Sequence, residues 1–247
     1  MPQSPDRPCH PGAVVPLTET TFRRLAQSSP WRFTRLHFTW HPGSRFDPVE
    51  ARLTRPDHLV VRLPDGRTQT VVERRDTAWA LVAQPDGSLS ADPAHLVPPD
   101  GHPARIDEHG LVVVRPDDRF VGYDDPMWQT YTWVAMLDPR ELADGTTVED
   151  LAETERSGRR TWWATMSAVG GEYEPRCGCC PLLWGEVSER AELAAGGPAW
   201  VRQDPGVVYP PAWLIGLDVA TGVVVSAEPV GGSRPDAGFS VTIHEVG

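Results

Sequence analysis

The sequence predicts a mainly β, α+β protein built on a curved antiparallel sheet with a few helices. Short segments in which apolar and polar residues alternate recur along most of the chain, which is typical of strands with one buried face. Turn sequences rich in proline, aspartate and glycine separate many of these segments. Residues 146–246 read as antiparallel strands rich in tryptophan, and this indicates a curved sheet that can hold apolar groups.

The N-terminal residues 1–16 are expected to form an irregular tail, and residues 17–247 a single β domain. Thr18 or Thr20 can cap a helix that continues to about Gln27, where serine and proline residues end it. Strands should follow at once. Residues 31–33 alternate in one phase and residues 36–40 in the opposite phase, so a β-bulge is predicted between them.

The middle of the chain mixes strands with a loop and a helix. Four further strands are predicted, at residues 49–53, 59–63, 71–72 and 78–83. Residues 88–108 are polar and rich in proline, so we expect a long surface loop before a short strand at residues 111–115. Asp124 and Asp125 precede Pro126 and should begin a helix whose apolar residues, from Met127 to Leu137, repeat at helical spacing.

The C-terminal half returns to strands. Residues 147–155 and 159–168 flank a Ser157-Gly158 turn and should form a hairpin with Trp162 and Trp163 on opposite faces. A short helix at residues 186–195 should end at the following glycines. The clearest hairpin joins residues 213–219 to residues 223–230, and residues 239–243 alternate through the last strand.

Four short motifs occur in a characteristic order along the chain. They are Leu53-Thr54-Arg55-Pro56-Asp57-His58-Leu59, Val71 to Trp79 before Gln84-Pro85-Asp86-Gly87, Gly158-Arg159 before Trp162-Trp163, and Leu217-Asp218-Val219-Ala220-Thr221-Gly222. Together they resemble the LolA-like fold of bacterial lipoprotein carriers and of a periplasmic sensor of envelope stress. The resemblance covers most of residues 17–247 and implies a strongly curved, unclosed half-barrel sheet with helices packed in its concave face. In the carriers, the arginine that matches Arg55 helps to hold the helical lid over the hollow.

Composition narrows the classes of function and location. A formal net charge of -11 gives no basic field for nucleic acid or for an anionic membrane surface. The N-terminus has no apolar run long enough for a signal peptide or a transmembrane segment, so a cytoplasmic location with reduced thiols is expected. Lysine and asparagine are absent, which indicates a GC-rich bacterial genome. The sequence contains no phosphate-binding glycine loop, nucleophile elbow or zinc-protease helix, which favours a non-catalytic protein.

Ten tryptophans are more than packing usually requires. Indole rings line apolar cavities and use their N–H group to orient a ligand. We therefore expect a pocket between the sheet and the helix around residues 127–137, with a lipid or another apolar molecule as its guest. Its predicted lining residues are Trp79, Trp128, Tyr131, Trp162 and Trp213.

Cys177, Cys179 and Cys180 form the only cysteine cluster. Thiolates of this kind bind zinc or copper(I), but a structural zinc site usually takes its ligands from two separate segments. Three interpretations stay open at this point: inert thiols, a disulfide that involves Cys9, and a metal or redox site. No other cofactor is expected.

The leading hypothesis is a non-catalytic binding or scaffolding protein that holds a lipid or other apolar ligand between sheet and helix. The alternative is a cytoplasmic protein that binds a metal or reacts through the thiols of residues 177–180. A structural module that binds a protein partner, whose identity the sequence does not give, is the third hypothesis.

Overall fold

A computed structural model describes residues 15–43, 47–72, 79–83, 89–93, 104–116, 125–197 and 204–247, with the backbone alone for residues 79–83 and 89–93. Nine strands form one antiparallel sheet in the order β4-β3-β2-β1-β13-β12-β11-β10-β9. β4 and β9 are its two ends, so the sheet is unclosed. The strands are β1 (Arg35–Pro42), β2 (Val49–Thr54), β3 (His58–Arg62), β4 (Thr68–Val72), β9 (Thr146–Arg156), β10 (Arg159–Ala168), β11 (Ala212–Asp218), β12 (Val224–Val230) and β13 (Phe239–Val246).

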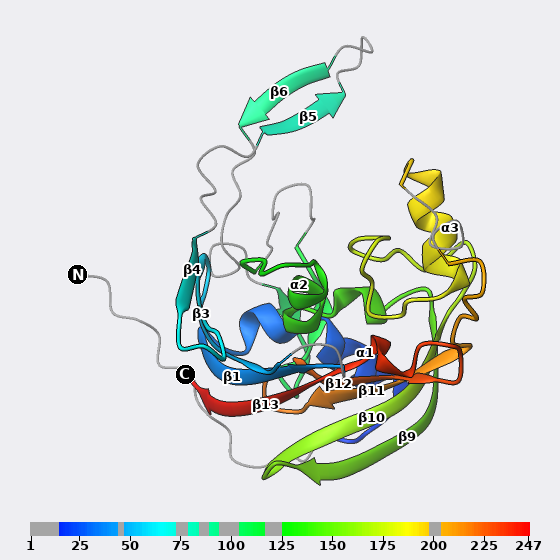
Figure 1. The fold of residues 1–247 in the computed structure, drawn as a ribbon. Coiled ribbons are helices and arrows are strands. Elements are labelled where there is room, and N and C mark those ends of the chain that lie inside the picture. The colour runs from blue at the N-terminus through cyan, green and yellow to red at the C-terminus, as the bar shows by residue number, and fades with distance from the viewer. Residues whose placement is uncertain are drawn as a thin grey trace.

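The sheet curves around two helices, α1 (Glu19–Ala26) and α2 (Thr132–Leu137), which lie in its hollow (Figure 1). The predicted fold class, an α+β protein with an unclosed half-barrel sheet and helices in the concave face, is confirmed. A third helix, α3 (Glu186–Ala194), and the 3-10 turns Ser29–Trp31, Arg140–Leu142 and Pro235–Ala237 complete the helical elements of the described residues. Two separate pairs of strands are β5 (Trp79–Ala83) with β6 (Leu89–Pro93), and β7 (Arg105–Ile106) with β8 (Val112–Val114).

The hydrophobic core fills the space between the sheet and these two helices. Alternate residues of the strands face inward and are buried, as in Leu36 and Phe38 of β1 and in Trp162, Ala164 and Met166 of β10. This is the two-residue period that the sequence predicts. From α2, the side chains from Trp133 to Leu137 are almost entirely buried. The helix thus occupies the hollow with its own side chains.

The predicted helix start and hairpin turn are both confirmed. Thr18 is the N-cap of α1, where its hydroxyl accepts a hydrogen bond from the Thr21 N–H at 3.2 Å. Ser157 and Gly158 have φ angles of 50° and 75° between β9 and β10. Two consecutive positive φ angles are what a two-residue hairpin turn requires, because they match the twist of the strands.

The structure corrects the prediction that a strand begins near Trp31. Trp31 ends a 3-10 turn, and β1 begins only at Arg35. Trp31 and Phe33 are separated by one polar residue, which is the spacing of a strand. A short turn can also place both aromatic side chains on one side, and so the pattern was misleading. The bulge lies later, between His37 and Phe38 in the pairing with β13.

The middle of the chain also differs from the prediction. α2 comprises Thr132–Leu137, whereas a helix from Pro126 was expected; Gln129 has a φ of 64°, which an α-helix does not allow. The expected loop at residues 88–108 contains β6 and β7. Asp124 and the Pro85-Asp86-Gly87 turn lie outside the described residues.

Candidate functional site: an apolar cavity beside a three-thiol loop

The residues predicted to line a pocket lie in different environments. Trp128 and Trp162 are buried in the core, where their indole N–H groups donate to Gln69 Oε1 and to Glu153 Oε2, each at 2.8 Å. Tyr131 is 37% exposed. The side chain of Trp79 lies outside the described residues. Of the four whose side chains are described, only Trp213 lines the apolar cavity beside α2 and β11. The shared ligand-binding role of the five residues stays a prediction.

The centre of the hollow is filled by aromatic rings. The ring centroid of Trp133 in α2 lies 5.4 Å from that of Phe38, 5.4 Å from that of Trp40 and 5.1 Å from that of Trp128. Trp133 itself is fully buried. Tilted and edge-on rings at these separations pack favourably. This part of the hollow is therefore core and offers no room for a guest.

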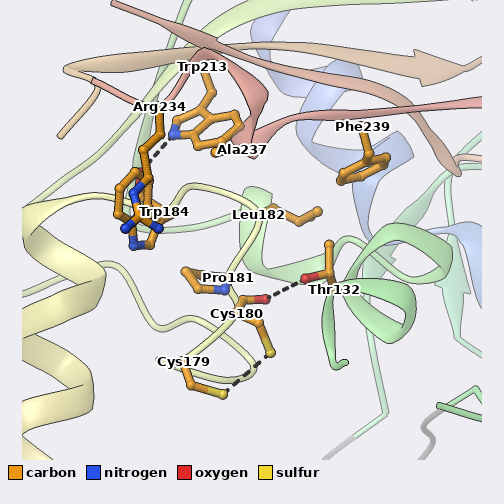
Figure 2. Close-up of a pocket in the computed structure, with 10 residues that line it drawn as sticks. All are labelled: Thr132, Cys179, Cys180, Pro181, Leu182, Trp184, Trp213, Arg234, Ala237 and Phe239. Carbon is orange, nitrogen blue, oxygen red and sulfur yellow. Dashed lines mark hydrogen bonds between the residues drawn. The ribbon is translucent and has the colours of Figure 1, made fainter. Parts of the chain in front are cut away.

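An apolar cavity of about 170 Å³ lies at one side of the hollow (Figure 2). It is bordered by α2, β11, β13 and the loop of residues 177–180, which we call the cysteine loop. The Trp213 indole N–H donates to the carbonyl of Trp184 at 2.9 Å, which holds both rings at the cavity. Arg234 stacks on the Trp184 ring and pairs with Asp204 at 3.1 Å. The lining residues are Thr132, Cys179, Cys180, Pro181, Leu182, Trp184, Trp213, Arg234, Ala237 and Phe239.

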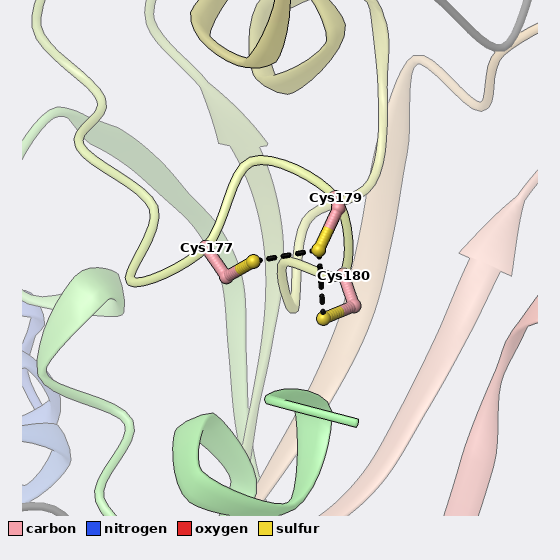
Figure 3. A group of neighbouring side chains, drawn as sticks. All are labelled: Cys177, Cys179 and Cys180. Carbon is pink, nitrogen blue, oxygen red and sulfur yellow. Dashed lines mark hydrogen bonds between the residues drawn. The ribbon is translucent and has the colours of Figure 1, made fainter. Parts of the chain in front are cut away.

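The cysteine loop borders this cavity and brings its three thiols together (Figure 3). The Sγ atoms of Cys177 and Cys179 are 2.7 Å apart, and those of Cys179 and Cys180 are 3.4 Å apart. All three sulfurs lie within 4.8 Å of one another. Cys179 is exposed and the other two are half-buried, so the cluster can be reached from solvent.

A single buried carboxylate closes the base of the loop. Glu141 accepts hydrogen bonds from the Arg176 N–H at 2.9 Å and from the Leu182 N–H at 2.7 Å, which lie on either side of the cysteines. It also accepts from the Tyr173 hydroxyl at 2.7 Å. Thr132 of α2 donates to the Cys180 carbonyl at 3.2 Å. These bonds fix the loop against the hollow from both ends.

Burial sets the protonation of these groups. It raises the pKa of Glu141, and the hydrogen bonds from Arg176, Tyr173 and Leu182 only partly offset this. Burial also raises the pKa of Cys179 and of Cys180, and the hydrogen bond with the neighbouring thiol of Cys177 adds to the effect at Cys179. These two thiols therefore carry their protons at neutral pH.

Arg176 precedes the thiols in the sequence, yet its guanidinium points to Asp138. Asp138 is fully buried between Arg176 and Arg115, and Arg115 makes two bonds of 2.9 Å to it. Burial alone would raise the pKa of Asp138, but the charges of Arg115 and Arg176 outweigh it and lower the pKa from 3.8 to about 2. Arg176 therefore forms part of the ion pair with Asp138 at the base of the cysteine loop.

The low pKa of Asp138 predicts an acid-sensitive contribution to stability. A carboxylate with a lowered pKa stabilises the fold above its unfolded-state pKa, and the contribution is lost as the pH falls. Between pH 3.8 and about 2 this loss should reach about 2 kcal/mol. Urea unfolding of an Asp138→Asn variant should show a correspondingly shallower decline over this range. The same change at the exposed Asp65 should leave the profile nearly as in the native protein, and an unchanged slope for Asp138→Asn would contradict the assignment.

Arg55 connects three parts of the hollow. Its guanidinium makes a bidentate pair with Asp125, at 2.9 and 2.8 Å, with both side chains buried. It also donates to the carbonyls of Ser29, in the 3-10 turn that follows α1, and of Leu137, at the end of α2. The Phe33 ring lies 3.8 Å from the guanidinium carbon. Asp125 was expected to cap a helix and instead binds Arg55; the lid-holding role of Arg55 stays a prediction that these contacts favour.

Glu141 and Asp138 were missed by the sequence analysis. Both lie in the short segment directly after α2. Their partners are 32 to 41 residues away in the chain for Glu141, and 23 and 38 away for Asp138. No periodic pattern signals such contacts.

Comparisons with known proteins show a distant likeness in fold. Neither known protein families nor curated proteins give a match to this chain. A solved structure that resembles it is the crystal structure of LprF from Mycobacterium bovis, with 11% sequence identity, a TM-score of 0.33, and coverage of 92% of this chain and 93% of that chain. A likeness this distant shows no function, and membership of the LolA-like family stays a prediction. Among the described residues, no helix is long and apolar enough to cross a membrane.

Proposed function

We propose that this chain is a non-catalytic binding protein that holds a small apolar group in the cavity beside Trp213. The observation that carries the proposal is the lining itself. Leu182, Trp184, Trp213 and Phe239 supply apolar surface, and the cavity measures about 170 Å³. For comparison of size, an enclosed cavity of about 150 Å³ lined by leucine, isoleucine and phenylalanine admits benzene.

The size of the cavity narrows the predicted guest. One aromatic ring, or the end of one acyl chain, fits about 170 Å³, whereas a complete lipid does not. The predicted ligand is therefore a small apolar molecule, or one apolar group of a larger molecule, and not the complete lipid expected from the sequence. In the described part of the chain, the lining holds no carboxylate or imidazole that could act as a general base, which supports binding without catalysis.

Toluene should bind the native protein at one site, and a side chain that fills the cavity should weaken this binding. Ala237 lies at the rim of the cavity and is exposed, so Ala237→Phe can enter the space without disturbing the core. We expect affinity to fall about tenfold or more, measured by calorimetry and by the shift of the Trp213 indole N–H signal in NMR spectra.

Ala152→Phe is the matched control because Ala152 is exposed on β9, away from the cavity lining. It should bind toluene as the native protein does. No binding of toluene to the native protein, or equal binding to the Ala237→Phe variant, would overturn the proposal.

A further inference from the structure

The thiol cluster has a geometry that apolar binding does not require. Three sulfurs from four consecutive residues, Cys177 to Cys180, lie within 4.8 Å of one another. A metal–sulfur bond of about 2.3 Å places the sulfurs of a three-coordinate site about 4 Å apart. The observed separations of 2.7 and 3.4 Å therefore need a change of only about 1 Å to reach that arrangement.

The loop is held in this shape before any ion binds. Glu141 joins the N–H groups of Arg176 and Leu182 across the base of the loop, and the Cys180 N–H approaches the Cys177 carbonyl at 3.4 Å. At Gly178, a Cβ atom would lie 2.7 to 2.9 Å from atoms of Glu192 in α3. The turn between the thiols thus packs so closely on α3 that only glycine fits. Preorganised ligands lose less conformational freedom when they bind an ion.

The number and kind of ligands select the ion. Within the described residues, no histidine, aspartate or glutamate joins the three thiols as a further ligand. Structural zinc is almost always bound by four ligands. Thiolates prefer soft ions, of which copper(I) is one. A set of three sulfurs alone therefore favours copper(I) over zinc.

We propose that Cys177, Cys179 and Cys180 bind one copper(I) ion as a three-coordinate thiolate site at the rim of the apolar cavity. Each thiol gives its proton to solvent as its sulfur bonds to the ion, and no electron is transferred. Glu141 is a positioning residue, because it holds the two ends of the loop and does not reach the ion. Cys179 and Cys180 also line the cavity, but copper(I) binding and toluene binding are measured separately, so each proposal can fail without the other.

The test is an anaerobic titration of the reduced full-length protein with copper(I) in competition with a chromophoric copper(I) chelator. We expect one copper per chain, with sulfur-to-copper charge-transfer absorption in the ultraviolet. Serine substitution of Cys177, Cys179 or Cys180 should each weaken binding by about tenfold or more. Circular dichroism of each variant should match the native protein, since these side chains belong to a surface loop.

Cys9→Ser is the matched control because Cys9 is the one cysteine that lies outside residues 177–180 in the sequence. It should keep native affinity, whereas Glu141→Gln should lose about tenfold through disorder of the loop base. Three sulfur neighbours in X-ray absorption spectra would support the site. Failure to retain copper, an equal loss in Cys9→Ser, or a four-coordinate zinc ion that copper(I) does not replace would each overturn it.

Discussion

Replacing Arg55 by alanine is expected to lower the free energy of unfolding by about 3–5 kcal/mol. The change deprives the buried carboxylate of Asp125 of its bidentate donor, and transfer of a charge to an apolar interior without such a partner is costly. It also removes the hydrogen bonds to the carbonyls of Ser29, in the 3-10 turn after α1, and of Leu137, at the end of α2. Urea unfolding at neutral pH, followed by tryptophan fluorescence, measures the loss.

An exposed ion pair provides the control for Arg55. Arg160 pairs with Glu153 at 2.8 Å, but these side chains are 46% and 38% exposed. Arg160→Ala should therefore cost about 1 kcal/mol or less. If Arg55→Ala cost no more than Arg160→Ala, Arg55 would not be what joins the turn after α1 and the end of α2 to the sheet.

Trp133→Ala should destabilise the protein by about 3–5 kcal/mol, because it removes the largest side chain that α2 places in the hollow. The loss combines buried apolar area with the cavity left among Phe38, Trp40 and Trp128. The variant should also bind a second toluene molecule in the new space. Chemical unfolding and calorimetry measure the two effects.

Trp163→Ala is the matched control for Trp133. Trp163 lies on the opposite face of β10 from Trp162 and is half-buried, so its removal opens no internal cavity. A clearly smaller loss and no second toluene site are expected. A loss in Trp133→Ala as small as in Trp163→Ala would show that the hollow collapses around α2.

Local patterns predicted the strands well because alternation reports which face of a strand is buried. The segments at residues 49–53 and 59–63, and the hairpins of the C-terminal half, lie where the pattern indicates. The helix before Leu137 was predicted too long, because the spacing of Met127, Tyr131 and Val134 is helical while the positive φ of Gln129 depends on surrounding structure.

The candidate site was predictable only in part. The cysteine cluster is visible in the sequence because its members are close along the chain. The cavity is not visible in the sequence, because Trp213, Phe239 and the cysteine loop come together only when β11 and β13 pair into the folded sheet. Trp128 and Trp162 were expected to line a pocket because aromatic residues suit both a core and a ligand site, and their place in the sequence does not distinguish the two.

The open end of the sheet at β9 has a consequence for how copies of this protein meet in solution. β9 has 11 residues, and within the described part of the chain no strand pairs with its outer edge; such an edge can pair with another chain, which is a common route to aggregation. β9 carries the exposed acidic residues Glu149, Asp150, Glu153 and Glu155, and two copies paired about Leu151 would set Glu149 against Glu153. Like charges in direct opposition repel, and the irregular pairing with β10 around Asp150 bends the strand further. This edge therefore resists growth into a continuous intermolecular sheet.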